Sequence, residues 1–138
     1  MFVVSDQRLG AVVAFSGLDA DGAFGVLRPP PAIGGMHNPA GLALAEEGTV
    51  VVADRDNGRV LVLFTASLTW VELGSGSLNR PTGVAVLPDG RVAVADSRRV
   101  LALGLDGSVE ELVAMAQGFV PVGVAEAGGR LYRRGHTG

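Results

Sequence analysis

The sequence contains no cysteine and no lysine, and its aromatic residues are few. The absence of cysteine from all 138 residues excludes disulfide bonds, thiolate nucleophiles and cysteine-based zinc sites. All 11 basic residues are arginines, the formal net charge is −3, and no basic block is present. Because phosphate binding requires clustered positive charge, we expect no nucleic-acid partner.

Long apolar runs and a targeting segment are also missing. No stretch approaches the roughly 18 consecutive apolar residues of a membrane-spanning helix, so we expect no membrane association. The first residues, MFVVSDQRLG, have no basic region before the apolar run and soon reach Asp6. The lack of a signal peptide and of cysteine favours a cytoplasmic location and leaves open that the N-terminus is truncated.

Glycine is abundant, with 21 residues spread between short apolar runs, which indicates many turns. The segment that starts at Pro39 returns 42 residues later. The pairs in this repeat are Pro39 and Pro81, Gly41 and Gly83, Gly48 and Gly90, and Asp54 and Asp96. A repeat of about 40 residues, made of short Val- and Ala-rich strands with glycine turns, is typical of a β-propeller blade.

The repeat divides the chain and predicts an all-β fold of about three four-stranded antiparallel blades. A third Pro-x-Gly opening begins at Pro121, but the aspartate expected near position 135 is missing. The segment EELVAMA could form a helix, but the repeat requires a strand there. We expect one propeller segment with a partial blade at 1–27, a Pro-rich connector at 28–38, blades at 39–74 and 79–115, a partial blade at 120–132 and an irregular tail at 133–138.

The order of these motifs resembles that of NHL repeats. It consists of Pro-x-Gly-Val-Ala-Val, an Asp-Gly turn, a strand that ends in Val-Ala-Asp, a polar turn and a Val/Leu-rich strand. The best match runs from Pro81 to Leu101, and the stretch from Pro39 to Phe64 is nearly as good. The resemblance implies a propeller, which in this family usually has about six blades. It is unspecific for function, because similar propellers include protein- and RNA-binding modules, lyases and lactonase-like hydrolases.

Three blades cannot close a ring, and an open propeller exposes strand edges and apolar faces. Two interpretations follow. The chain is a fragment of a larger propeller, or a homodimer completes a six-bladed ring in which each chain donates its last strand to the first blade of its partner. We expect either a protein partner or self-association through the open blade edges.

Aspartate recurs where the second strand of each repeat ends, at Asp6, Asp54 and Asp96. A ring of carboxylates could bind Ca²⁺. An aspartate at a strand end also accepts N–H bonds from the next turn, and its recurrence in every repeat favours this structural role. The Asp19–Gly22 segment faintly resembles a calcium loop but lacks the required spacing, and we interpret it as a turn.

A metal site in the central channel would need ligands near the innermost strands. His37 and Asn38 precede Pro39, and Asn79 is the counterpart of His37 in the next repeat. These three residues are the weak candidates for a channel site that holds Ca²⁺ or Zn²⁺, while His136 lies in the aberrant tail. The arginines at positions 130, 133 and 134 are too few to predict nucleic-acid binding.

The polar loops at the channel mouth form the predicted binding surface. Its residues are Arg55, Asp56, Asn57, Ser97, Arg98 and Arg99. No nucleophile–histidine–carboxylate arrangement or phosphate loop is evident, so we predict no catalytic or cofactor-binding residue. The preferred function is a non-enzymatic scaffold that binds a protein or another ligand. The alternative is a metal-dependent, lactonase-like hydrolase or lyase that requires a complete ring.

Overall fold

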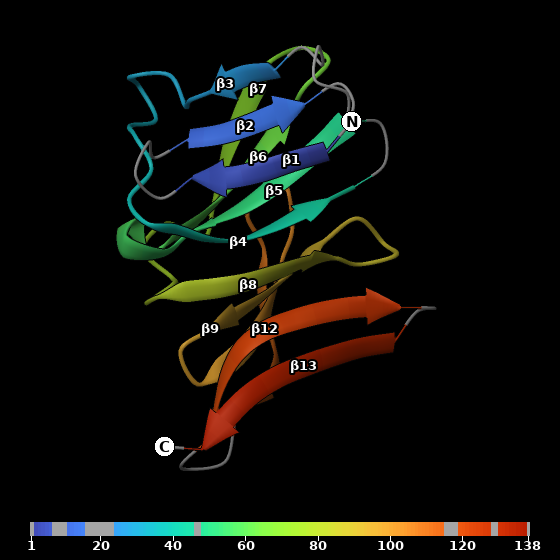
Figure 1. Cartoon of the computed structure of the whole chain (residues 1–138). Coiled ribbons are helices and arrows are strands. Elements are labelled where there is room, and N and C mark those ends of the chain that lie inside the picture. The colour runs from blue at the N-terminus through green and yellow to red at the C-terminus, as the bar shows by residue number, and fades with distance from the viewer. Residues whose placement is uncertain are drawn as a thin grey trace.

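The computed structural model describes residues 2–6, 11–15, 24–45, 48–114, 119–127 and 130–137, which form four antiparallel sheets (Figure 1). The first sheet contains β1 (Phe2–Asp6), β2 (Ala11–Phe15) and β3 (Phe24–Leu27). The second contains β4 (Pro39–Leu44), β5 (Thr49–Asp54), β6 (Arg59–Phe64) and β7 (Thr69–Leu73). The third contains β8 (Pro81–Val86), β9 (Val92–Asp96), β10 (Arg99–Leu103) and β11 (Val109–Ala114). The fourth contains β12 (Phe119–Ala127) and β13 (Arg130–Thr137).

Within each sheet the strands follow one another in chain order, so the first strand always lies at an edge. These edge strands, β4, β8 and β12, lie side by side and run in the same direction (Figure 1). The sheets therefore stack from the first to the fourth with their first strands along a common axis, which is the arrangement of propeller blades. The prediction of an all-β fold with antiparallel sheets is confirmed.

The second sheet is covered on both faces, which explains why its strands are continuous apolar runs. Successive residues of a strand point to opposite faces. Val51 and Val62 pack toward the third sheet with Val94 and Leu101, whereas Val52 and its neighbours face the other side. That second cluster contains Met36, Val50, Val52, Leu61 and Leu63, with Leu27 and Ile33 against it. Each fully buried Val or Leu stabilises the fold by about 1.5–3 kcal/mol.

The glycine of the Pro-x-Gly motif allows neighbouring first strands to approach closely. A Cβ atom on Gly41 of β4 would lie 2.6 Å from the carbonyl oxygen of Thr82 and 2.9 Å from the Cα atom of Gly83 in β8. Both contacts are to backbone, which cannot rotate away. The repeat therefore keeps a glycine at this position because the sheets converge there.

One boundary prediction was wrong. The C-terminal residues 133–137 belong to β13 and not to an irregular tail, while residue 138 lies outside the described residues. Arg133 pairs with Val124, Arg134 with Gly123 and Gly135 with Pro121. Backbone pairing requires no apolar side chain, so the polar sequence did not reveal the strand.

Two other predictions about local structure are confirmed. Residues 28–38, the Pro-rich connector, contain no strand, and β11 is a strand where a helix was the alternative. The turn predicted at Asp19–Gly22 lies outside the described residues. Within the part of the chain that the structure describes, no helix has the length and apolar character needed to cross a membrane.

Candidate functional site

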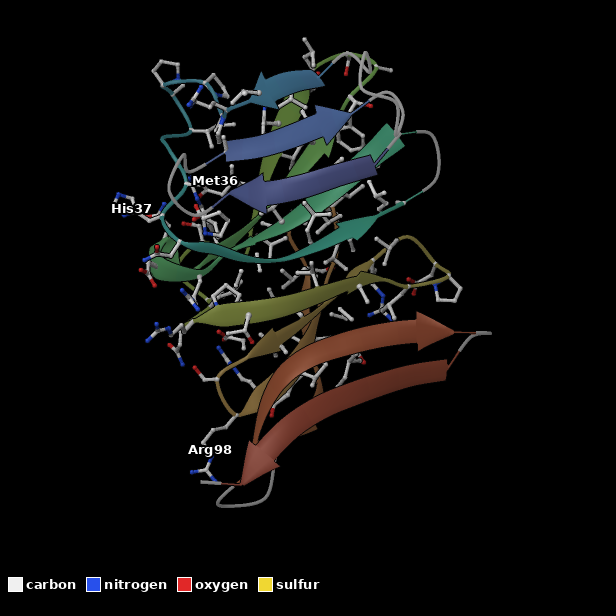
Figure 2. All side chains as sticks on the ribbon, in the orientation of Figure 1. Met36, His37 and Arg98 are labelled. Carbon is white, nitrogen blue, oxygen red and sulfur yellow. The ribbon has the colours of Figure 1, made fainter. Side chains whose placement is uncertain are left out.

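The loops between second and third strands and the connectors that precede the first strands lie at one end of the sheets. We call this end the connector face. It contains the 3₁₀ turn η2 (Arg55–Asn57), the turn at 97–98 and the connectors 33–38 and 74–80. Figure 2 shows His37, from the connector before the second sheet, and Arg98, from the third sheet, at this same end; Met36, next to His37, belongs to the buried cluster of the second sheet. Because every repeat places equivalent segments there, polar groups far apart in sequence gather on one face.

Asp54 and Asp96 hold the connectors in place. The carboxylate of Asp54 is fully buried and accepts the backbone N–H of His37 at 2.7 Å. Asp96, also fully buried, accepts the backbone N–H groups of Asn79 at 3.0 Å and Arg80 at 2.7 Å. Both aspartates thus accept backbone N–H groups, which is the kind of contact that was predicted for them. The donors, however, belong to the preceding connector and not to the next turn, because the connector returns past the end of the second strand.

Each buried carboxylate also has an arginine partner in the next strand. Asp54 lies opposite Arg59, whose Nε donates to it at 2.7 Å, and Asp96 lies opposite Arg99, whose Nη2 donates to it at 3.0 Å. A charge buried without a partner would cost several kcal/mol. The arginines therefore compensate the burial of the aspartates in both complete sheets.

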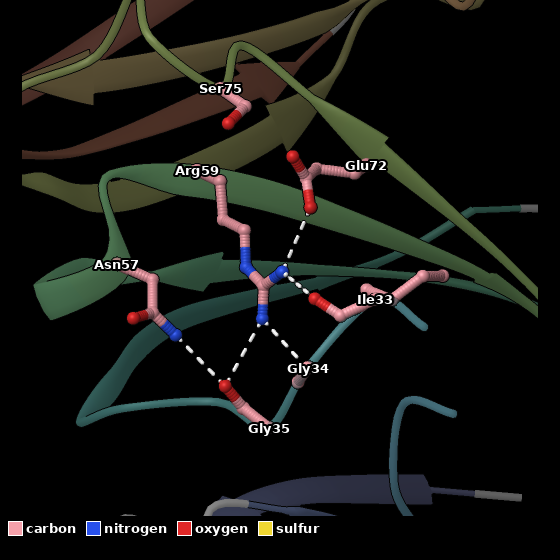
Figure 3. A pocket seen from close by; sticks show the side chains of 7 residues that line it. All are labelled: Ile33, Gly34, Gly35, Asn57, Arg59, Glu72 and Ser75. Carbon is pink, nitrogen blue, oxygen red and sulfur yellow. Dashed lines mark hydrogen bonds and ion pairs between the residues drawn. The ribbon is translucent and has the colours of Figure 1, made fainter. Parts of the chain in front are cut away.

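Arg59 lies at the centre of a shallow pocket of about 230 Å³ on the connector face (Figure 3). The pocket is lined by Ile33, Gly34, Gly35, Asn57, Arg59, Glu72 and Ser75. Besides Asp54, the guanidinium donates to the carbonyls of Ile33, Gly34 and Gly35 at 2.6, 2.9 and 3.1 Å. It also donates to Glu72 at 2.8 Å. A guanidinium has five N–H donors, and these five acceptors use all of them, so Arg59 fixes the connector and has no donor left for an anion.

The Arg59–Glu72 contact changes the acidity of both groups. The hydrogen bond from Arg59 lowers the pKa of Glu72 from its ordinary value, against the opposing effect of partial burial. Burial acts to lower the pKa of Arg59, but the hydrogen bonds with Asp54 and Glu72 outweigh it and raise the pKa overall. Both groups are therefore held in their charged forms at neutral pH.

A second group of side chains lies where the first strands begin, and we call it the entrance cluster: Asn38, Asp56 and Arg80. The side-chain amide of Asn38 donates to the carboxylate of Asp56. Arg80 lies 3.9 Å from the other oxygen of that carboxylate, and its side chain is 64% exposed. Asp56 is fixed further by its own N–H, which donates to the carbonyl of His37 at 3.1 Å. A loop of the second sheet thus connects the entrances of β4 and β8.

The proposed metal candidates occupy this region, but their contacts differ. Asn38 uses its side chain to bind Asp56, whereas His37 and Asn79 form hydrogen bonds through their backbones. Among the described residues, no group of three His, Asp or Glu side chains is placed to hold a metal ion. The side chain of His136 lies outside the described side chains. A channel metal at His37, Asn38 and Asn79 stays a prediction.

The residues of the predicted binding surface differ in their contacts. Asn57 donates to Asp54 and to the carbonyl of Gly35, and Arg99 binds Asp96 and the carbonyl of Ser77. Both residues therefore stabilise the connectors. Arg55 is partly covered, and Ser97 adopts a left-handed backbone with φ of 55°. Asp56 and Arg98 are exposed at the face.

Arg59, Glu72 and Arg80 belong to these clusters and were not predicted from the sequence. A signal for Arg59 was present, since an arginine follows the repeated aspartate in both complete blades. The signal was obscured because four residues separate Asp54 from Arg59 and only two separate Asp96 from Arg99. Glu72 carries no repeat signal.

The comparisons with known proteins agree with this geometry. The family model for the NHL repeat matches residues 36–63 and 78–99. A search of curated proteins found no match. Among solved structures, a streptogramin B lyase aligns with a TM-score of 0.75 and 14% identity over 95% of this chain and 43% of its own.

Two further structures show the same likeness. A catalytically inactive virginiamycin B lyase from Staphylococcus aureus, with quinupristin, has a TM-score of 0.74 and 15% identity over 92% of this chain and 42% of its own. A protein assigned as a gluconolactonase has a TM-score of 0.64 and 17% identity over 92% of this chain and 54% of its own. The chain spans about half the length of these structures, or less, and at such identities the likeness concerns the fold. Together with the stacked sheets, it shows that the chain has the fold of a β-propeller and carries NHL repeats at residues 36–63 and 78–99.

Proposed function

We propose that this propeller segment is a non-enzymatic scaffold that binds a peptide segment of a protein partner on its connector face. The observation that carries the proposal is the entrance cluster, in which Asp56 links Asn38 and Arg80 across the starts of two first strands. Buried Asp54 and Asp96 hold the surrounding backbone, so little conformational entropy is lost when a partner binds.

The chemistry of the cluster suits a polar peptide with an acidic group. The Arg80–Asp56 contact is long, at 3.9 Å, and Arg80 is largely exposed. Exposed ion pairs contribute little stability, so a partner carboxylate can take over the Arg80 guanidinium at small cost. Asp56 and Asn38 offer further hydrogen-bonding groups at the same place.

Peptide selection on the immobilised chain tests this proposal. Peptides selected from a random displayed library are measured against the chain by fluorescence polarisation. We expect Arg80→Ala to weaken binding by roughly tenfold or more, as loss of a charge-assisted hydrogen bond would. Arg91→Ala is the matched control. Arg91 forms ion pairs with Asp89 and Glu110, but it precedes β9 and therefore lies at the end of the sheet away from Asp96 and the connector face. Equal loss in the two variants, or none in Arg80→Ala, would contradict the proposal.

A metal-dependent hydrolase or lyase is the second candidate, favoured by the lyase and gluconolactonase among the structural neighbours. In a complete ring, His37, Asn38 and Asn79 would contribute oxygen and nitrogen ligands for Ca²⁺ or Zn²⁺. The test is metal analysis of the purified chain with turnover of a lactone and ester panel. Stoichiometric metal with turnover that Asn38→Ala abolishes would replace the scaffold proposal, and no metal-dependent turnover would reject the enzyme.

A further inference from the structure

The hairpin of β12 and β13 repeats the pairing of a first and second strand. Pro39 pairs with Asp54 in the second sheet, Pro81 with Asp96 in the third, and Pro121 with Gly135 in the fourth. The register shifts just after the proline in all three sheets. β12 is therefore a first strand, and β13 occupies the place of a second strand with glycine where the other sheets have the connector-binding aspartate.

β1 has the opposite deficiency. It pairs with β2 as β5 pairs with β6, and Asp6 lies opposite the first residue of the next strand, as Asp54 and Asp96 do. In the described part of the first sheet, however, β1 is the edge strand and no first strand lies beside it. The sequence FVVSD also matches VVVAD of β5 and VAVAD of β9 much better than β13 does. β1 thus corresponds to a second strand, and among the described residues its free edge has no first strand beside it.

The sequence of β13 suits a second strand poorly once further sheets surround it. By register, Arg134 occupies the position of Ala95 and Arg133 that of Val94, because they pair with Gly123 and Val124 as those residues pair with Gly83 and Val84. Ala95 and Val94 are fully buried between sheets. Burying two charged arginines at positions that the third sheet fills with Ala95 and Val94 would be costly, whereas the sequence of β1 offers the small Ser5 and the apolar Val4 there.

We propose that β12 of one copy of this chain pairs with β1 of a second copy and displaces β13. The expected register places Pro121 against Asp6, Val124 against Val4 and Ala125 against Val3. Asp6 then accepts the N–H groups of the residues before Pro121, as Asp54 and Asp96 do in their own sheets.

This exchange closes a ring. Each hybrid sheet contains β12 from one copy and β1, β2 and β3 from the other, which makes four strands. Two hybrid sheets and the two complete sheets of each copy give six sheets of four strands. The first and fourth sheets lie at opposite ends of the stack, so one chain cannot make this contact with itself (Figure 1). The two contacts are equivalent by a two-fold axis, which closes the assembly at the dimer. The proposal is independent of the peptide-binding function.

Engineered disulfides in the full chain test the exchange, because the chain has no cysteine of its own. The variant with Val3→Cys and Ala125→Cys should form a covalent dimer on oxidation, since directly opposed strand residues lie within disulfide reach. The matched control combines Ala125→Cys with Tyr132→Cys, which pair within the hairpin. Its oxidation should lock β13 onto β12 and give a monomer, and reduction should restore the dimer.

Light scattering at micromolar concentration provides the readout against the chain mass of 14.1 kDa. We expect twice this mass for the unmodified chain and roughly tenfold or greater weakening of the dimer by Asp6→Ala. Asp106→Ala is the control, because its carboxylate binds Ser108 in an exposed turn of the third sheet. A monomeric unmodified chain, an unlinked Val3–Ala125 cysteine variant, or a dimer that persists when the hairpin is locked would overturn the proposal.

Discussion

The second and third sheets come from the same repeat but hold their connectors differently. In the second sheet Arg59 is 7% exposed and binds two carboxylates and three carbonyls. In the third sheet Arg99 is 33% exposed, and it donates to Asp96 and to the carbonyl of Ser77. The aspartate is common to both sheets, while the role of the arginine varies.

The connectors explain this difference. The segment that leads into the second sheet is Pro-rich, and the carbonyls of Ile33, Gly34 and Gly35 all turn to Arg59. Both connectors contain an internal turn: the N–H groups of Ile33 and Gly34 donate to Pro30 in one, and those of Ser77 and Leu78 donate to Gly74 in the other. They differ in how many carbonyls turn toward the arginine, because Arg99 reaches one connector carbonyl, that of Ser77, where Arg59 reaches three. The repeat therefore supplies the buried aspartate in both sheets, whereas the connector determines how much the arginine contributes to stability.

The largest expected effect separates the two arginines. Arg59→Met should reduce the free energy of unfolding by about 3–5 kcal/mol, because it leaves the buried Asp54 carboxylate without its charge partner and the carbonyls of the connector without their donor. Arg99→Met should cost about 1 kcal/mol, since that arginine is partly exposed and Asp96 retains two backbone donors. Urea unfolding followed by circular dichroism measures both. Equal losses would show that the connector does not set the contribution of the arginine.

A second prediction concerns what the two sheets share, which is the close approach of their first strands. Gly41→Ala should destabilise the chain by about 1–3 kcal/mol, because the new methyl group meets the backbone of Thr82 and Gly83. Gly35→Ala is the matched control, since a Cβ atom at Gly35 would have no neighbour within 4 Å and its backbone is not left-handed. It should change stability by less than about 0.5 kcal/mol. If Gly41→Ala were as neutral as Gly35→Ala, the sheets would not depend on this contact.

The features that sequence analysis predicted are those that the repeat encodes locally. The apolar strands, the glycine turns and the strand-end aspartates recur at fixed spacing, so they define the sheets and the structural role of Asp54 and Asp96. The acceptors of Arg59 carry no such signal, because three are backbone carbonyls that any residue could supply. The pairing of β13 was missed for a related reason, since Arg133 and Arg134 do not resemble the apolar residues of other second strands. Side chains that meet across loops of different length, such as Asp56 and Arg80, also require the three-dimensional structure.

The smallest expected effect comes from Glu72, the second carboxylate that binds Arg59. Among the described residues, Arg99 forms an ion pair with Asp96 and with no second carboxylate, so this effect should be confined to the second sheet.

Glu72→Gln should cost about 1 kcal/mol at pH 7, because the ion pair is partly exposed. The hydrogen bond from Arg59 lowers the folded-state pKa of Glu72 below its ordinary value of 4.5. The contribution of the ionised carboxylate is therefore complete above that ordinary value and is lost as the pH falls through the lower folded-state pKa. Urea unfolding of the unmodified chain and of Glu72→Gln from pH 7 to pH 3 should show that the difference in their stability shrinks as the pH falls. The other carboxylates are present in both proteins, so their titration cancels in this difference. In the Arg59→Met background the same substitution should have little effect at any pH, and an undiminished effect there would mean that Glu72 acts through another partner.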